Sequence, residues 1–172
     1  MIKSRMKYLA LALTASFFMC GGAQAATQSV TANMAFDSVL SLTKNADINF
    51  GTVKASTVGT YTINTAGTVT PAGGGVIVGG TTAFGQITIT GSASQTVSIS
   101  TGTYTANNGV TPSAATCSYD GAAASACDTP LTGLAAPGVG KVLRLGVTAS
   151  SDGTQAAGAT AAPTFVVTVI YG

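Results

Sequence analysis

The sequence predicts an all-β fold, an antiparallel sandwich or a small barrel, and three observations support this prediction. Thr, Val, Ser, Ala and Gly dominate the chain, apolar and polar residues alternate in short runs, and Gly, Pro, Asn and Asp separate these runs. β-branched side chains suit a pleated surface, and alternation with period two turns one face inward. About eight short strands with turn signals between them are typical of a sandwich or a barrel.

The chain up to Ala25 is predicted to be a secretory signal peptide, so the fold begins after it. Basic residues up to Lys7 precede the apolar run Tyr8–Met19, and a small-x-small pattern ends at Ala25. This arrangement predicts cleavage between Ala25 and Ala26, and the apolar run is too short to be a transmembrane anchor. Cys20 leaves lipid attachment as an alternative, although the bulky residue before it does not fit such a site.

The first expected strand, Ser29–Leu42, begins shortly after the cleavage site. Its apolar residues occupy even positions, and they are Val30, Ala32, Met34, Phe36, Leu40 and Leu42. The other expected strands are Ile48–Val53, Thr60–Asn64, Gly75–Val78, Ala83–Thr90, Gln95–Ser100, Val142–Thr148 and Thr164–Tyr171. Thr101–Gly140 is rich in small residues, and we expect a long decorated hairpin or a loop region there.

The cysteines of the exported chain indicate a disulfide. After cleavage only Cys117 and Cys127 remain, and export places them in an oxidising compartment, where a pair of cysteines usually bonds. We expect this bond near the surface, closing a loop of about eleven residues and stabilising the fold by roughly 2–3 kcal/mol. Two buried free thiols are the alternative. A metal site lacks further ligands, because the chain contains no His.

The composition argues against several functional classes. Charged residues make up 7% of the chain, compared with about 25% in typical domains, and no basic face is clustered for nucleic acid. A Ser-His-Asp triad and a histidine zinc site are impossible without His, and the five acidic residues are scattered aspartates. Gly73–Gly80 does not match a dinucleotide fingerprint, and Val142 after Gly140-Lys141 replaces the hydroxyl residue of a phosphate loop. We therefore expect no enzyme, no metal site and no cofactor.

Each end of the exported chain carries an apolar-faced strand that allows two interpretations. The N-terminal segment is either an ordinary first strand of its own sandwich or a protruding strand that adds to the sheet of another subunit. Phe165–Tyr171 is either an ordinary last strand of the core or the edge of a groove that accepts a partner's strand. The low charge suits a protein inside a polymer, which needs no charge to prevent association.

Four segments resemble a known protein family. They are Thr27–Leu42 (TQSVTANMAFDSVLSL), Ile48–Val53 (INFGTV), Phe84–Gly91 (FGQITITG) and Phe165–Gly172 (FVVTVIYG). Together they resemble a family of exported bacterial proteins, domain of unknown function 4402. The opening segment is also similar to the mature start of chaperone–usher pilins of the colonisation-factor and common-pilus type.

This resemblance implies an immunoglobulin-like β-sandwich that lacks one strand. A periplasmic chaperone would complete the fold first, and the N-terminal strand of the next subunit would replace the chaperone at an outer-membrane usher. By this analogy, the donor residues that fill the acceptor groove are Val30, Ala32, Met34 and Phe36. The residues that form one edge of the groove are Phe165, Val167, Val169 and Tyr171.

We therefore expect a signal peptide at residues 1–25, a donor extension at residues 26–38 and one sandwich domain at residues 39–172. The expected function is that of a pilin-like structural subunit, which passes through the periplasm and joins a cell-surface fibre, or fimbrium, by donor-strand exchange. A stand-alone exported binding or adhesin module is the alternative, although a chain without Trp is poorly supplied for an aromatic platform. A small outer-membrane β-barrel is a further alternative, but the aromatic girdles of such barrels are missing.

Overall fold

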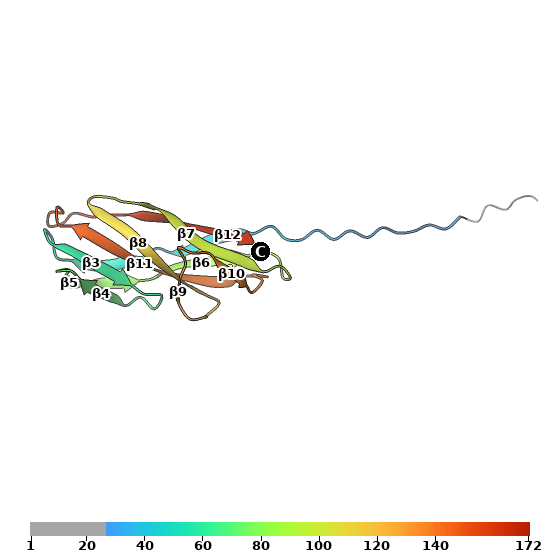
Figure 1. The fold of residues 1–172 in the computed structure, drawn as a ribbon, viewed down its shortest axis with the longest axis horizontal. Helices are drawn as coiled ribbons and strands as arrows, with labels where there is room; N and C mark the ends of the chain where they lie inside the picture. The colour runs from blue at the N-terminus through green and yellow to red at the C-terminus, as the bar shows by residue number, and fades with distance from the viewer. Residues whose placement is uncertain (1–26) are drawn as a thin grey trace, which may run out of the picture. The chain divides into compact units, whose positions relative to one another are not determined.

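The computed structural model describes residues 27–172, and all of their regular secondary structure is β-strand. The predicted cleavage site at Ala25 and Ala26 lies outside the described residues. The compact unit that holds every strand is Phe36–Gly172 (Figure 1). In chain order the strands are β1 Ser41–Ala46, β2 Asn49–Val53, β3 Val58–Ile63, β4 Val69–Ala72, β5 Ile77–Ala83, β6 Gly85–Thr90, β7 Val97–Thr105, β8 Val110–Tyr119, β9 Ser125–Ala126, β10 Leu131–Leu134, β11 Lys141–Asp152 and β12 Thr164–Tyr171.

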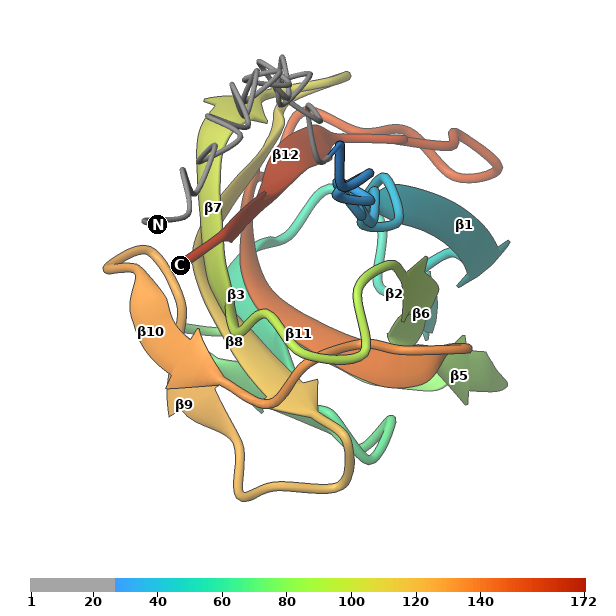
Figure 2. The ribbon, with the colours of Figure 1, turned by 90° about the vertical axis from the view of Figure 1, so that its right-hand side faces the viewer.

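The strands form a large seven-stranded sheet, a small three-stranded sheet and a separate two-stranded sheet, all of them antiparallel (Figure 2). The long strand β11 organises the large sheet: residues 141–145 pair with β6, residues 147–152 pair with β3, and β8 pairs with β11 over residues 143–151. β1 and β4 extend this sheet beyond β6 and β3, and β9 pairs with β8. The small sheet has the order β10-β7-β12, and β2 and β5 pair with each other. The predicted fold class, an all-β antiparallel sandwich, is confirmed.

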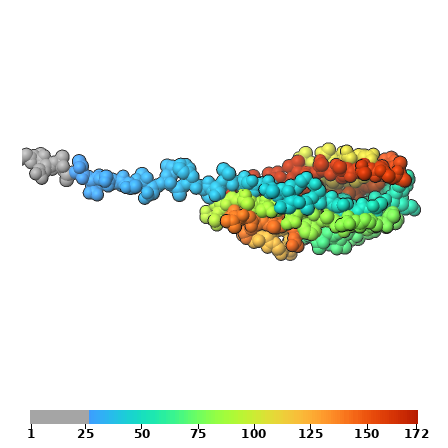
Figure 3. All heavy atoms as spheres, turned by 180° about the vertical axis from the view of Figure 1, so that it is seen from behind, coloured from blue at the N-terminus to red at the C-terminus, as the bar shows by residue number. Residues whose placement is uncertain are grey.

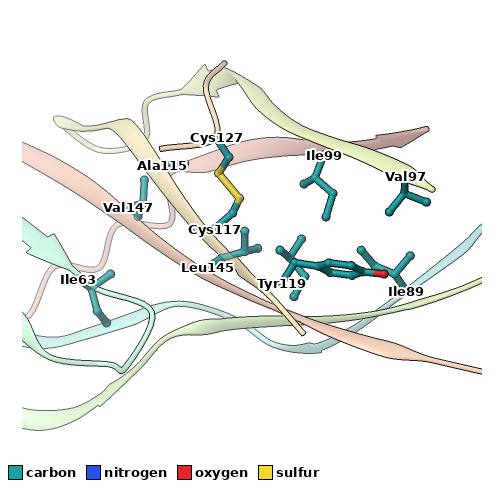
Figure 4. Packing of buried hydrophobic residues seen from close by; sticks show 11 residues of the cluster. Ile63, Ile89, Val97, Ile99, Ala115, Cys117, Tyr119, Cys127, Leu145 and Val147 are labelled. Atoms are coloured by element: carbon teal, nitrogen blue, oxygen red, sulfur yellow. A yellow bond between two sulfur atoms is a disulfide. The ribbon is translucent and has the colours of Figure 1, made fainter. Parts of the chain in front are cut away.

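The hydrophobic core draws side chains from the large and the small sheet, and β11 supplies much of it. Leu143, Leu145 and Val147 of β11 are at most 4% exposed. Arg144 lies between them in the sequence and is exposed, as expected for successive residues on opposite faces of a strand. Figure 4 shows part of this packing; the fully buried aliphatic side chains of the other strands are Ile63, Ile89, Val97 and Ile99.

Cys117 and Cys127 form a disulfide inside this core. Their sulfur atoms are 2.05 Å apart and their Cα atoms are 5.8 Å apart, which confirms the predicted pairing. The expected position near the surface is wrong, because the two residues are 1% and 0% exposed. Cys117 shares the inward face of β8 with Ala115 and Tyr119, and Figure 4 shows the bond among these side chains.

The stretch Thr101–Gly140 is not the hairpin or loop region that we expected. β7 continues to Thr105, and β8 is a ten-residue strand of the other sheet, so the two do not pair with each other. Ala114 of β8 has a φ of 51°, and the register opposite it shifts between Gly146 and Thr148 of β11. A β-bulge of this kind interrupts the alternation of side chains, which explains why the pattern of β8 does not predict a strand.

The expected first strand, Ser29–Leu42, is present only at its end. Ser41 and Leu42 belong to β1, whereas residues 27–40 form no strand. A strand needs a neighbour for its backbone hydrogen bonds, and none of the described strands pairs with residues 27–40. Of the expected strand Gly75–Val78, only Ile77 and Val78 are in a strand, because β5 begins at Ile77 and continues to Ala83. The remaining expected strands are present with bounds shifted by a few residues, and β12 has the predicted bounds Thr164–Tyr171.

Candidate functional site

An open groove lies on the compact unit, between the first strands and the C-terminal part of the chain. Its volume is about 980 Å³. One wall comes from residues between 44 and 55, in β1, β2 and the connection between them, and the other from residues between 155 and 167, which lead into β12. In the space-filling view of Figure 3, the red surface of the C-terminal strand runs beside the cyan surface of the first strands.

The floor of the groove is apolar and continuous with the core. Leu145 and Val147 of β11 line it together with Ile87 of β6. Leu145 and Val147 are each 4% exposed, so the groove reaches down to the packed interior. Alternation along β11 places these side chains on the inner face of the sheet. A segment that enters the groove therefore meets hydrophobic side chains.

Free strand edges border the groove on both sides. Within residues 27–172, β12 pairs with β7 alone and β1 pairs with β6 alone. The other edge of each strand presents backbone N–H and C=O groups that can pair with an additional strand. Leu42 of β1 lies opposite the buried Ile89, on the core side of the sheet, yet it is 41% exposed. No described residue covers this part of the core side of β1 completely.

β12 turns its four predicted edge residues toward the core, but two of them line the open groove and two do not. The odd-numbered residues that pack against the core, as predicted, are Phe165, Val167, Val169 and Tyr171. Phe165 and Val167 line the groove. At the other end of β12 the chain itself fills the space, because the Tyr171 hydroxyl donates to the Ser38 carbonyl at 2.6 Å and Leu40 packs against the core.

Sequence reasoning missed the remainder of this wall, residues 155–163. The segment contains no strand, and side-chain hydrogen bonds hold it. Gln155 Nε2 donates to the Asn108 carbonyl at 2.9 Å and to Asp152 Oδ1 at 2.7 Å. The backbone amide of Thr154 donates to the same Asp152 carboxylate and holds its pKa below the ordinary value. The sequence offers no period here, only a cluster of small residues that ends at Pro163.

The four predicted donor residues lie outside any strand. They are Val30, Ala32, Met34 and Phe36. Val30, Met34 and Phe36 are 89%, 78% and 88% exposed. Residues 27–36 carry no charged side chain, and their apolar residues alternate as in a strand. No described strand pairs with them. The role of this segment as a donor remains a prediction.

The charged groups of the groove lie on its rim. Lys44 and Asp47 form an ion pair at 2.7 Å, with side chains that are 65% and 78% exposed, and such a pair contributes little to stability. Lys54 also lines the groove.

Within residues 27–172, no group of three or more His, Cys, Asp or Glu residues could hold a metal ion. No helix in the same residues is long and apolar enough to cross a membrane. The apolar floor of the groove suits a segment with apolar side chains.

Comparison with known sequences identifies a family for this chain. The sequence profile described as "Domain of unknown function (DUF4402)" matches residues 40–171. No curated protein and no solved structure matches the chain. The matched range includes both walls and the floor of the groove, and the segment with Val30, Ala32, Met34 and Phe36 precedes it.

Proposed function

The chain belongs to the DUF4402 family, and we propose that it is a structural subunit of a bacterial surface fibre, joined to the next copy by strand addition. In this proposal the N-terminal segment of one copy, residues 27–36, enters the groove of another copy and pairs with β12. The observation that carries the proposal is the groove itself, which combines an apolar floor with free strand edges. The same chain supplies an unpaired, uncharged and apolar segment that has the chemistry to fill it.

The energetics of such a contact are favourable. Burial of Val30, Met34 and Phe36 would contribute about 1.5–3 kcal/mol for each side chain. Each backbone hydrogen bond of the new ladder would add about 0.5–1.5 kcal/mol. These gains oppose the cost of association, about 4–15 kcal/mol, so several apolar positions and a ladder are needed together. Main-chain pairing gives affinity in this mode of recognition, and the alternate side chains give specificity.

The arrangement leads to a filament because donor and acceptor are different parts of one chain. Each copy can accept one segment and donate another, and a head-to-tail contact that does not close on itself produces a linear polymer. The similarity of the opening segment to pilin starts supports export, a periplasmic chaperone that covers the groove before assembly, and an outer-membrane usher. A fibre subunit of this kind carries no catalytic residues and no cofactor.

A donor-deletion variant tests the proposal. Removal of residues 26–36 eliminates the apolar segment and leaves the groove intact. This variant should bind a synthetic peptide of residues 27–36 and should rise in melting temperature when it does, since a ligand of the folded state stabilises it. Mixed with the full mature chain, it should terminate polymers, which sedimentation velocity and electron microscopy would detect as shorter fibres.

The matched control is the same peptide with Val30→Asp and Met34→Asp, which retains the length but not the apolar face. Long fibres formed by the deletion variant alone would contradict strand donation. A variant that remains folded but binds neither the peptide nor a chaperone would favour a stand-alone module in place of a fibre subunit.

A further inference from the structure

A small apolar patch lies on the compact unit beside the base of the N-terminal segment. Val39 and Val139 are 85% and 104% exposed. Both line a hollow of about 420 Å³, together with Ala93 and the turn residue Gly138. We call Val39, Ala93 and Val139 the basal patch. Single exposed apolar side chains are common on protein surfaces. This patch is distinguished by the hydrogen bonds next to it, which hold the adjoining residues of the chain in place.

These hydrogen bonds form a clamp around Asp37. The carboxylate accepts from Ser92 Oγ and from Gln95 Nε2, both at 2.6 Å. Ser92 is fully buried, and its bond, followed by that from the Ser38 amide, holds the pKa of Asp37 below the ordinary value. Tyr171 continues the clamp, because its hydroxyl accepts from the Ser92 amide at 2.7 Å and donates to the Ser38 carbonyl at 2.6 Å. Residues 37 and 38 are thus tied to the connection between β6 and β7 and to the end of β12.

The clamp leaves no spacer between the donor segment and the rest of the subunit. Phe36, the last predicted donor residue, directly precedes Asp37, and residues 27–40 contain neither Gly nor Pro. Val39 follows Phe36 by three residues, and an extended chain spans about 3.3–3.6 Å per residue. If Phe36 occupies the groove of a neighbouring copy, the Cα atom of Val39 lies within about 11 Å of the Phe36 Cα atom in that groove.

We propose that the basal patch is a second contact between neighbouring subunits, in which Val39 and Val139 pack against the rim of the groove that holds the donor segment. The partner is a second copy of this chain. The inference rests on the proposed function, because it assumes strand addition. It adds that neighbouring subunits are joined by direct contact of their compact units as well as by the donated strand. Apolar burial at this contact slows dissociation of the subunits.

The test compares two double variants of the full mature chain. Val39→Ser with Val139→Ser removes the apolar part of the basal patch. Val58→Ser with Val78→Ser is the matched control, because these valines are 65% and 66% exposed and neither lines the groove or the hollow. Fibres of the first variant should dissociate about tenfold faster than wild-type fibres, equivalent to about 1.4 kcal/mol. They should also bend more in electron micrographs, and both variants should bind the peptide of residues 27–36 with wild-type affinity.

A second variant changes the spacing between the donor residues and the basal patch without changing any side chain of either. Insertion of Gly-Ser-Gly between Phe36 and Asp37 preserves the donor residues, the groove and the patch but allows the bodies to move apart. It should reproduce the faster dissociation. Unchanged dissociation and stiffness in both the patch variant and the insertion would overturn the second contact while strand addition stands. Failure of the wild-type chain to form any polymer or bind the peptide would overturn both proposals.

Discussion

Val167 and Val166 are neighbours on β12 that face opposite sides, so an aspartate at each position should have very different effects. Val167 lines the groove, whereas Val166 is 50% exposed on the other face. We expect Val167→Asp to abolish strand addition, because a strand placed over the carboxylate would remove its water without supplying a partner. The effective penalty for burying an ion is several kcal/mol. A cost of about 3–4 kcal/mol corresponds to binding that is about 10²–10³-fold weaker.

The assay is a titration of the mature chain with the fluorescent peptide of residues 27–36, followed by sedimentation of the polymers. Val166→Asp is the control for added charge on the same strand, and it should bind the peptide as the wild type does. Val167→Thr tests the loss of apolar character without charge, and it should weaken binding about tenfold, consistent with a cost of about 1–3 kcal/mol. Thermal unfolding checks that each variant is folded. Peptide binding by folded Val167→Asp within about threefold of wild type would refute β12 as the acceptor edge.

Two further predictions concern stability and pH. Replacing Cys117 and Cys127 by Ala should lower the free energy of unfolding by roughly 2–5 kcal/mol, measured by urea denaturation; a loss below about 1 kcal/mol would contradict the structural role that their burial indicates. The pKa values of Asp37 and Asp152 lie below the ordinary value in the folded protein, so their stabilisation is fully present above about pH 4 and is lost as the pH falls through the folded pKa values. The urea concentration at the unfolding midpoint should therefore decrease as the pH is lowered from about 5 to about 2. The decrease should be smaller after Asp37→Asn, and an unchanged pH dependence in that variant would contradict the clamp.

The strands that could be predicted from sequence are those whose side chains alternate without interruption. β12 has the predicted bounds because its odd positions are apolar from Phe165 to Tyr171 and alternate with exposed even positions over the whole strand. β4 was not predicted because Pro71 stands within it, and an edge strand tolerates a proline that a central strand would not. β8 was missed because of the bulge at Ala114 and because few of its buried positions hold large apolar side chains.

The candidate site was only partly predictable, because a groove depends on which strands lie beside one another. The alternation of Phe165 and Val167 indicates an inward face, but not that nothing covers this face on one side. The wall formed by residues 155–163 depends on hydrogen bonds of Gln155 to residues distant in sequence, such as Asn108. The clamp at Asp37 likewise depends on contacts across the fold. Periodicity identifies the buried face of a strand, whereas the groove and the clamp depend on how the strands are arranged relative to one another.

The free edge of β12 is the strongest physical argument against a stand-alone monomer. Monomeric sheet proteins protect their edges with charged residues, prolines or bulges that prevent pairing with other chains. β4 has Pro71 at its edge of the large sheet, whereas Thr164–Tyr171 contains no charge and no proline. The groove beside it leads to the core through Leu145 and Val147. A chain with this edge open would associate indiscriminately. Under the proposed function we therefore expect the groove to be covered first by a chaperone and then by the neighbouring subunit.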